Sequence, residues 1–425
     1  MIKSDIVIVG GGPAGLMAAG KLGQAGIPVL LLEKMEKTGK KLRITGKGRC
    51  NVSNSRPQRE FINAFGTQGK FLYSAFSRFF RDELLNFFKH ELHIELTEER
   101  GGRIFPSSQN AHEIADKLTD WAVGHHVNIL YHHSCDSLIV HGDKIQAVSC
   151  RTPSGLQQYE TSAVLIATGG ASYPATGSTG DGYKLALQAG HTIIPPAPAL
   201  VPLVAEQGDR YGLQGLSIKN ALVSVYTEGK KTASMFGEFL FTHFGLSGPV
   251  VLTLSREIVL SLRHQKRISL EIDFKPALDE QTLDKRLIRE FTTHGNKKLK
   301  NVFRFLMPEA LGPVCLSQTG VSGDIPCNVV RVEERKKILH WMKHFTVKIS
   351  GYRSLDEAIV TQGGVYLKEI EPATLRSKYI PNLYFAGEVL DLAADTGGYN
   401  LQAAFSTGWC AAESMIQQIH QAQDQ

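Results

Sequence analysis

Three glycines near the start of the chain have the spacing of a dinucleotide-binding turn. Gly10, Gly12 and Gly15 form a GxGxxG pattern, and Pro13 and Ala14 begin the helical segment that follows. In such a turn the first glycine permits a tight bend, the second lets bare backbone approach a pyrophosphate, and the third allows a helix to pack closely on a strand. The positive end of the helix dipole then favours the phosphates.

An acidic residue gives the glycine pattern a sharper meaning. Residues 5–9 form an apolar strand pattern before the glycines, and a second strand pattern, 29–32, ends at Glu33, 21 residues after Gly12. A carboxylate at this place accepts hydrogen bonds from both hydroxyls of an adenosine ribose and disfavours a 2′-phosphate. The alternative is a glycine turn with a purely structural role. We therefore expect a bound dinucleotide.

Two distant turns favour FAD over NAD as that dinucleotide. Strand patterns end at Thr168-Gly169 and, near the end of the chain, at Gly387-Glu388. These turns resemble those with which flavoproteins of the two-dinucleotide-binding fold pass their cofactor, where the acidic residue contacts the ribityl chain and the pyrophosphate. Only a long dinucleotide needs both turns, so FAD is the expected cofactor.

The last helical segment supplies a further part of the expected site. It begins around Gly398, Asn400 and Leu401. Its backbone N–H groups and positive dipole end suit the N1–C2=O edge of a flavin, which becomes negative on reduction. Lys34 and Lys41 are either FAD contacts or solvated neighbours of the cofactor.

Longer segments narrow the resemblance to one family. They lie at 46–54 (GKGRCNVSN), 241–249 (FTHFGLSGP), 361–365 (TQGGV), 385–391 (FAGEVLD) and 397–402 (GGYNLQ). Together they are similar to the BaiN/RdsA family of FAD-dependent flavoproteins, and the similarity covers nearly the whole chain. Members of that family include a reductase that converts a uridine of bacterial large-subunit (23S) ribosomal RNA to dihydrouridine, and relatives proposed to reduce small enones in bile-acid breakdown.

The resemblance implies one reaction type for both kinds of substrate. Reduced flavin gives a hydride from N5 to the β-carbon of a conjugated carbonyl, which is C6 in uracil, and an acid protonates the α-carbon, which is C5. A second dinucleotide fingerprint is not found, because the glycine-rich segment 177–182 has no preceding strand and no second acidic residue. NADH or NADPH would therefore dock transiently as the electron donor.

The loop around Cys50 contains the candidate acid. By analogy with related flavoproteins this loop passes beside the isoalloxazine ring, so Gly48, Arg49, Cys50 and Asn51 are expected cofactor contacts. A thiol with an ordinary pKa of about 8.5 is still protonated at neutral pH and can donate a proton. The alternative is a small buried thiol that packs against the flavin. Arg49 either orients a substrate or positions the cofactor.

Two further residues carry weaker expectations. His243 is a candidate for the catalytic site, although a packed, hydrogen-bonded loop histidine is the simpler interpretation. Cys135 lies on the strand pattern that usually passes the adenine, where its backbone rather than its thiol would bind. The six cysteines of the chain form no CxxC pair and no Cys/His cluster, so the sequence supports neither a metal site nor a disulfide framework.

These motifs require one α/β domain assembled from both ends of the chain. We expect residues 1–190 and 351–425 to form a discontinuous FAD domain with a parallel sheet and the two-dinucleotide-binding fold. A mixed β/α insert would occupy 191–350, rich in strands to about 275 and helical from about 276 to 350.

The excess of positive charge lies in that insert. Residues 191–350 hold 22 Lys and Arg against 15 Asp and Glu, whereas the rest of the chain holds 25 against 26. Such a surface either is simply solvated or contacts a polyanion such as RNA. Since no apolar segment reaches the roughly 18 residues of a membrane span and the start of the chain lacks a signal-peptide pattern, we expect a cytoplasmic protein.

Three functions follow from these observations. The leading one is flavin-dependent reduction of a uridine in ribosomal RNA. The second is reduction or dehydrogenation of a small conjugated ketone. The third is a non-catalytic flavoprotein that binds RNA.

Overall fold

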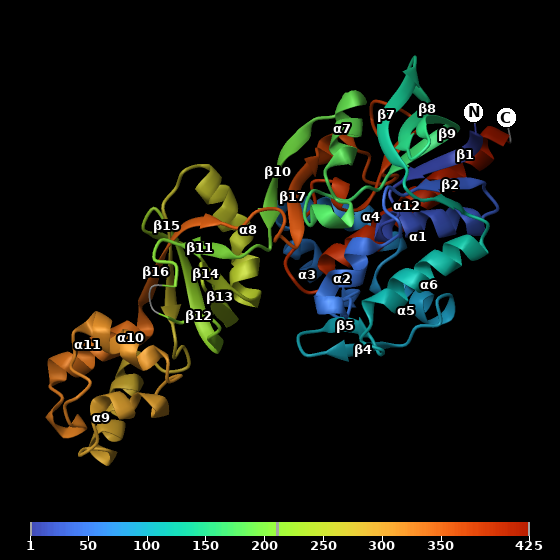
Figure 1. Cartoon of the computed structure of the whole chain (residues 1–425). Helices are drawn as coiled ribbons and strands as arrows, with labels where there is room; N and C mark the ends of the chain where they lie inside the picture. Colours follow the sequence, from blue (N-terminus) through green and yellow to red (C-terminus); the bar gives the residue numbers. More distant parts are fainter. Residues whose placement is uncertain (1, 210–211, 424–425) are drawn as a thin grey trace. The chain divides into compact units, whose positions relative to one another are not determined.

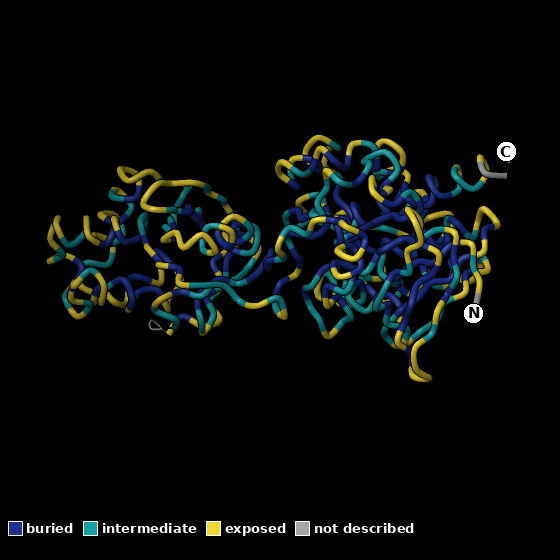
Figure 2. The backbone as a smooth tube through the Cα atoms, turned by 90° about the horizontal axis from the view of Figure 1, so that it is seen from above, coloured by how far each residue is buried: buried dark blue, intermediate teal, exposed yellow. Residues whose placement is uncertain are grey.

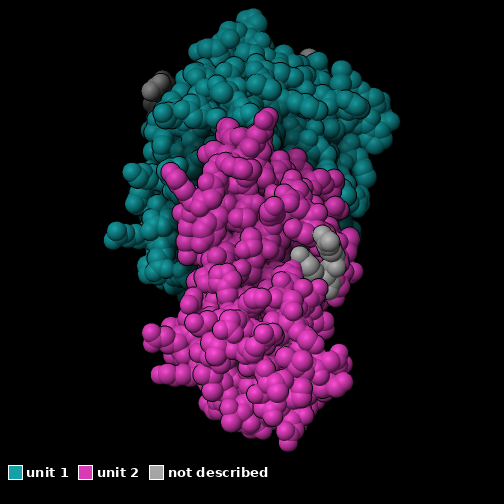
Figure 3. Space-filling view, turned by 90° about the vertical axis from the view of Figure 1, so that its left-hand side faces the viewer, with its two compact units in different colours: residues 1–198, 358–425 teal, residues 199–357 magenta. Residues whose placement is uncertain are grey.

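The computed structural model describes residues 2–209 and 212–423 of the chain. It divides into two compact units, which are described separately (Figure 3). Unit 1 comprises Met1–Pro198 and Ala358–Gln425, and unit 2 comprises Ala199–Glu357. Unit 1 is thus built from both ends of the chain, whereas unit 2 is one continuous segment.

Unit 1 is organised around a seven-stranded sheet (Figure 1). Its strands in spatial order are β6 (Asn128–Leu130), β2 (Val29–Leu32), β1 (Ile2–Val9), β9 (Gly155–Ile166), β8 (Lys144–Thr152) and β7 (Ser134–His141), and β18 (Leu383–Phe385) also pairs with β9. The strands β6, β2, β1, β9 and β18 run parallel, and β7 and β8 form an antiparallel extension. Residues 6–9 of β1 and all of β2 and β18 are buried, which explains their continuous apolar sequences; Figure 2 colours the backbone by burial.

Helices cover this sheet. They are α1 (Pro13–Gln24), α2 (Lys40–Gly48), α3 (Gln58–Ala64), α4 (Tyr73–Arg78), α5 (Arg81–His90), α6 (Ala111–Gly124), α7 (Asp181–Gln188) and α12 (Tyr399–Gln423). Small residues let α1 approach its neighbours closely: a Cβ added at Gly408 of α12 would lie 2.3 Å from the carbonyl oxygen of Ala14, and one at Gly20 would lie 2.0 Å from the Trp121 ring of α6. The first and last helices of the chain therefore pack together.

Two smaller sheets complete unit 1. One joins β3 (Ser53–Asn54), β5 (Arg103–Pro106) and β4 (Leu96–Glu99), and the other joins β10 (Ile193–Ala199) and β17 (Val360–Val365). The second sheet explains a correction to the expected boundaries. The first segment of unit 1 ends at Pro198, after the expected limit of 190, because β10 pairs with β17, and its second segment begins at Ala358, after the expected limit of 351.

Unit 2 contains a closed six-stranded barrel. Its strands in spatial order are β11 (Leu203–Ala205), β14 (Gly245–Ser247), β13 (Lys230–Thr242), β12 (Ser217–Thr227), β15 (Ile268–Asp273) and β16 (Phe345–Tyr352). The barrel closes because β11 pairs with both β14 and β16. Along β16, buried and exposed side chains alternate over its first six residues, as expected for a strand with one face on a core.

The helices of unit 2 correct the expected division of the insert. They are α8 (Pro249–Arg263), α9 (Glu280–Thr293), α10 (Leu311–Thr319) and α11 (Val332–Lys343). The α8 helix lies within the part expected to be rich in strands, and most of β16 lies within the part expected to be helical. The reason is that closing the barrel requires a strand contributed after the helices.

Candidate active site

The glycine turn follows β1 and begins α1. Gly10 has a φ of +106°, and a Cβ added there would lie 2.6 Å from the carbonyl oxygen of Ala167, while a Cβ at Gly15 would lie 1.9 Å from the carbonyl oxygen of Gly10. These two glycines are required by contacts within the protein. Gly12 differs, because its backbone is extended and an added Cβ would meet no atom of the described residues within 4 Å. The open space beside Gly12 lies at the N-terminus of α1, which no side chain caps.

Glu33 is attached to the same turn. Its carboxylate accepts hydrogen bonds from the backbone N–H groups of Gly11, at 2.9 Å, and Met35, at 2.8 Å. The side chain is buried, and this burial raises the pKa of Glu33 despite the two backbone donors. The carboxylate therefore lies at the glycine turn, and its expected role toward an adenosine ribose stays a prediction.

Three turns meet at one edge of the sheet. Because β1, β9 and β18 are neighbouring parallel strands, the residues that follow them reach the same carboxyl-terminal edge, where ligands of such sheets bind. Gly10 approaches Ala167, which precedes Thr168, and a Cβ at Gly387 would lie 2.9 Å from the Cβ of Ala14. A Cβ at Gly169 would lie 4.0 Å from a carboxylate oxygen of Glu388. The structure thus brings together the turn residues that the sequence singled out.

Glu388 is the centre of a polar network at this edge. Its carboxylate accepts hydrogen bonds from Lys41 Nζ at 2.8 Å, Ser172 Oγ at 3.1 Å and the backbone N–H of Thr361 at 2.8 Å. Thr361 Oγ1 in turn accepts the N–H groups of Ala171 and Ser172. Lys41 is therefore a partner of Glu388 rather than a solvated neighbour.

Lys34 has a different partner from Lys41. Its ammonium pairs with Asp181 at 2.6 Å, and side-chain exposure is 22% for Lys34 and 26% for Asp181. Asp181 begins α7 and follows the glycine-rich segment 177–182, so the ion pair attaches that segment to the end of β2. The same pair lowers the pKa of Asp181, although burial alone would raise it. Lys34 accordingly stabilises the segment that the sequence left without a role.

The loop after α2 is joined to the start of α12. Asn54 Nδ2 donates to the carbonyl oxygen of Gly397 at 2.9 Å, and Ser53 Oγ donates to Gln402 Oε1 at 2.6 Å. A Cβ at Gly398, where φ is +95°, would lie 2.2 Å from the carbonyl oxygen of Ser53. Two motifs nearly 350 residues apart, GKGRCNVSN and GGYNLQ, are therefore in direct contact.

Other residues at the start of α12 hold the preceding loop. Asn400 accepts the N–H of Ala394 at 2.9 Å and donates to the carbonyl oxygen of Ala394 at 3.1 Å. The Asn400 side chain is therefore occupied by hydrogen bonds within the protein. Any ligand contact at this helix end would be made by the backbone of Gly398 and Leu401.

Cys50 is placed differently from the expected acid. Its side chain has no exposed surface, although the structure contains no ligand that could cover it. Burial raises the pKa of Cys50 to about 12, and its N–H donates to the carbonyl oxygen of Thr45 at 3.0 Å. A group that reaches no open space cannot protonate a substrate directly, so the geometry favours the alternative interpretation of Cys50 as a packed thiol.

The two neighbours of Cys50 in the chain differ in their hydrogen bonding. Arg49 donates to Glu99 and to Gln109, both at 2.9 Å, and its guanidinium lies 4.2 Å from the centre of the Phe105 ring. Asn51 Oδ1, by contrast, is buried and has no hydrogen-bond partner among the described residues. Since buried carbonyl oxygens rarely stay unpaired in proteins, Asn51 Oδ1 is a candidate acceptor for a polar group of a ligand.

The remaining sequence candidates lie apart from these contacts. His243 belongs to unit 2, where it is exposed in the turn between β13 and β14 with its ring edge-on to Phe244 at 4.8 Å. Cys135 is buried on β7 opposite Cys150 on β8, and the interaction with Cys150, together with burial, raises its pKa. Gly48 has a φ of +83° and open space where its Cβ would be.

The residues that support Glu388 were not predicted from the sequence. Thr361 lies within the TQGGV segment of the family resemblance, and Ser172 lies outside all of the predicted motifs. Tyr183 on α7 was also missed: its hydroxyl is buried without a hydrogen-bond partner among the described residues. Burial, with the carboxylates of Glu388 and Asp391 nearby, raises its pKa far above the ordinary value. The polar residues of TQGGV were the one signal available beforehand.

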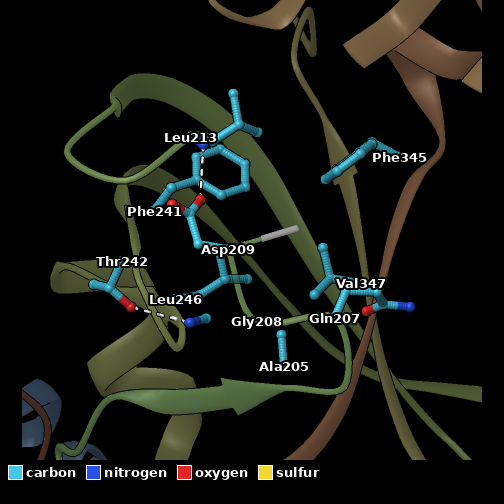
Figure 4. A pocket seen from close by; sticks show the side chains of 11 residues that line it. Ala205, Gln207, Gly208, Asp209, Leu213, Phe241, Thr242, Leu246, Phe345 and Val347 are labelled. Carbon is cyan, nitrogen blue, oxygen red and sulfur yellow. Dashed lines mark hydrogen bonds between the residues drawn. The ribbon is translucent and has the colours of Figure 1, made fainter. Parts of the chain in front are cut away.

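Two other features were considered as sites. Within the described residues no three His, Cys, Asp or Glu side chains are grouped to hold a metal ion. A small, mainly apolar pocket in unit 2 is lined by residues such as Leu213, Phe241 and Val347 (Figure 4). Its one carboxylate, on Asp209, already accepts the backbone N–H groups of Leu213 and Gln214. The pocket therefore offers no reactive group.

No helix among the described residues has both the length and the apolar character needed to cross a membrane.

Comparisons with known proteins place this geometry in a family. The profile of the HI0933-like protein Rossmann domain matches residues 4–414. A ribosomal RNA dihydrouridine synthase of Escherichia coli is 31% identical over 98% of this chain and 99% of its own length. A 3-dehydro-bile acid delta(4,6)-reductase of Clostridium scindens is 30% identical over 96% of this chain and 98% of its own length.

Solved structures share the fold at low sequence identity. The 3-ketosteroid delta1-dehydrogenase of Sterolibacterium denitrificans has a TM-score of 0.54 at 12% identity and covers 98% of this chain, with 100% of its own length matched. The 3-ketosteroid-delta4-(5alpha)-dehydrogenase of Rhodococcus jostii has a TM-score of 0.52 at 13% identity, covering 98% and 97%. The family predicted from the motifs is confirmed: the chain belongs to the HI0933-like, BaiN/RdsA-type flavoproteins, and it is an FAD-dependent oxidoreductase.

Proposed function

We propose that this protein reduces a uridine of 23S ribosomal RNA to 5,6-dihydrouridine, with NADH or NADPH as the electron donor. Relatives alone do not choose the substrate, because an RNA-modifying enzyme and a bile-acid reductase are similarly close in sequence. The observation that carries the proposal is the unpaired positive charge of unit 2. A small apolar ketone gives no reason for such a surface, whereas phosphates do.

The structure refines which cations are available. Lys266, Lys297, Arg304, Lys336 and Lys337 are exposed, and none of them makes an ion pair within the described part of the chain. Other basic residues of unit 2 are partly neutralised: Arg335 pairs with Asp284, Arg267 pairs with Glu228, and Lys298 and Lys300 share Asp324. The surface for RNA is therefore smaller than the sequence suggested.

The residues of unit 1 fit FAD. The open space beside Gly12, the uncapped start of α1 and the adjacent Glu33 suit a pyrophosphate and a ribose, and the unpaired Asn51 Oδ1 suits a polar group of the ligand. We propose that the backbone of Gly12, Pro13 and Ala14 and the side chain of Glu33 hold the adenosine diphosphate part. When bound, FAD supplies the hydride for reduction of a conjugated carbonyl.

The other end of FAD would meet the remaining turn residues. We assign it to the backbone of Thr168, Gly169 and Gly387 and to the start of α12 at Gly398 and Leu401. Glu388, held by Lys41, would present a fixed carboxylate there, and the N–H groups of the helix start would stabilise negative charge. Cys50, in this proposal, packs below the ligand and keeps its proton.

A second candidate function is reduction of a small conjugated ketone. It is favoured by the bile-acid reductase of Clostridium scindens, which is similar to this chain over nearly its whole length. A third possibility, a flavoprotein that binds RNA without catalysis, shares the charged surface of the first but predicts no turnover.

The decisive experiment measures dihydrouridine in 23S ribosomal RNA from a strain that lacks the gene. We expect the modification to be absent and to return with the wild-type gene, but not with a Gly12→Val variant that cannot hold FAD. Unchanged dihydrouridine in the deletion strain would overturn the proposal. Parallel assays of the purified protein with NADH or NADPH and a conjugated steroid ketone test the second candidate, and flavin reduction without product supports the third.

A further inference from the structure

An exposed aromatic ring lies in the helical part of unit 2. Phe305 ends the short 3-10 helix Phe303–Phe305 and is 39% exposed, whereas Phe303 and Leu306 beside it are buried at 1%. The buried neighbours attach the segment to the core and leave Phe305 facing outward. Since a single exposed aromatic ring is common on protein surfaces, the neighbours of Phe305 decide whether it forms part of a site.

A second ring extends the surface of Phe305. His294 follows α9, and its ring is stacked on Phe305 with 4.6 Å between centres and 21° between planes. The backbone of both residues is fixed, because His294 N donates to the carbonyl oxygen of Glu290 and Arg286 donates to that of Phe305 at 3.1 Å. Stacked on this backbone, the two rings form one aromatic surface.

Positive charges surround this pair. The guanidinium carbon of Arg304 lies 5.0 Å from the centre of the Phe305 ring, and Lys297 Nζ lies 5.9 Å from it. Both cations are exposed, and no carboxylate of the described residues pairs with either. Nearby in sequence, Lys298 and Lys300 share the single carboxylate of Asp324, at 3.0 and 2.8 Å, which leaves one positive charge in excess.

We propose that His294 and Phe305, with Lys297 and Arg304, form a platform that binds single-stranded nucleic acid. An exposed ring offers a stacking surface for a base, and adjacent cations bind the phosphates that flank it. A duplex does not fit the platform, because its bases are already stacked on one another. A protein partner is less well matched, since the exposed apolar surface here is one ring among cations. The inference rests on the proposed function and specifies that unit 2 holds an unpaired stretch of the RNA.

The test uses the full-length, FAD-loaded protein and a fluorescein-labelled 12-nucleotide RNA of mixed sequence, alone or paired with its complement. Fluorescence anisotropy in 0.1 M NaCl gives both dissociation constants. We expect Phe305→Ala to weaken single-strand binding about tenfold and duplex binding less than about twofold, since stacking on one base is lost. Phe305→Trp should retain single-strand affinity. The control is Phe236→Ala, which removes another phenylalanine of unit 2 that is 59% exposed, and should leave both constants unchanged.

The charges are tested separately. Lys297→Ala with Arg304→Ala should weaken both RNAs and reduce the slope of log affinity against log salt by about 1 to 2, because two phosphate contacts disappear. Thermal melting of each variant verifies the fold. The inference is overturned if wild-type protein binds neither RNA, if Phe305→Ala binds the strand as wild type does, or if it weakens strand and duplex equally. It is likewise overturned if Phe305→Ala weakens binding to anionic lipid vesicles but not binding to RNA.

Failure of this inference is distinguishable from failure of the proposed function. A protein that binds single strands through Phe305 but forms no dihydrouridine retains the platform and loses the proposed activity. A protein that forms dihydrouridine while its RNA affinity is indifferent to Phe305 retains the activity and loses the platform.

Discussion

The two units of this protein present opposite kinds of surface. In unit 1 the candidate site is made of closely packed backbone: an added Cβ at Gly10, after β1, would lie 2.6 Å from the carbonyl oxygen of Ala167, after β9, and one at Gly398, at the start of α12, would lie 2.2 Å from that of Ser53. In unit 2 the candidate surface is made of exposed side chains, where cations surround an aromatic pair. The difference means that one added methyl group can decide function in unit 1, whereas in unit 2 binding depends on the chemistry of exposed side chains.

Substitution of Gly12 should have the largest effect. A Cβ added at Gly12 meets no atom of the described residues within 4 Å, so we expect Gly12→Val to lower FAD affinity by more than about 100-fold with little change in the unfolding temperature of the FAD-free protein. Released flavin after gel filtration and thermal melting measure the two quantities. Gly15→Val is the matched control: it should lose both FAD and stability, because its side chain would overlap the carbonyl of Gly10. If Gly12→Val retains FAD, the turn does not hold the pyrophosphate.

Charge reversal in unit 2 should have the next largest effect. Lys336→Glu with Lys337→Glu is expected to weaken binding of ribosomal RNA fragments by about tenfold or more in 0.1 M salt, and the effect should shrink as salt is raised. Lys117→Glu with Lys144→Glu, at exposed positions of unit 1, is the control and should change affinity little. Equal losses in both pairs would mean that RNA binding follows net charge rather than the surface of unit 2.

Acid should destabilise unit 1 through a buried histidine. His191 is 2% exposed, with its two ring nitrogens 3.2 Å from Glu369 and 2.7 Å from Ser377 Oγ. Burial lowers the pKa of His191 below 6.5, so its contribution is complete above that pH and is lost as pH falls through the lowered folded-state value. The pKa of Glu369 is also lowered, by hydrogen bonds from Thr192 and others that outweigh its burial, which adds a loss below 4.5.

Urea unfolding between pH 7.5 and 5 measures this effect. We expect the free energy of unfolding to fall across that range, and His191→Gln to show a smaller fall than wild type. The exposed His141→Gln variant is the control and should follow wild type. A wild-type stability that is constant from pH 7.5 to 5 would contradict the assignment.

Substitution of Cys50 should have the smallest effect. Because the thiol is buried and its pKa is about 12, Cys50→Ala should leave turnover within about twofold and cost about 1 kcal/mol of stability, through loss of packing. Product formation per bound FAD measures turnover independently of any loss of stability. A loss of 100-fold or more with FAD retained would restore Cys50 as the proton donor.

Elements could be predicted from the sequence where the backbone conformation requires particular residue types. Gly10 and Glu33 lie at the ends of parallel strands, so their spacing predicted the strand–helix–strand elements, whereas the hydrogen bond from Gly11 to the Glu33 carboxylate was not predicted. The pairing of Lys41 with Glu388, 347 residues apart, was beyond reach, because nothing local in either segment names its partner. The burial of Cys50 was equally hidden, since it depends on the packing around a loop.

The barrel of unit 2 shows a different limit. Strands β11 and β14 have three residues each, too short for a recognisable alternation. Strand β16 follows a helical segment, and its role in closing the barrel is set by pairing with β11 and β15 rather than by its own sequence. The net charge of unit 2 could be counted from the sequence. Which cations Asp284 and Asp324 neutralise could not be predicted from it.

The close packing of α1 and α12 has a consequence for synthesis. Strand β18 and the helix that contains Gly408 leave the ribosome last. Gly387 and Gly408 can therefore contact Ala14, at the glycine turn, only when translation is almost complete. The barrel, which is continuous in sequence, can close earlier. Newly made chains are therefore expected to complete unit 2 before they are able to retain flavin, and a chain halted before residue 383 is expected to have a barrel but no redox activity.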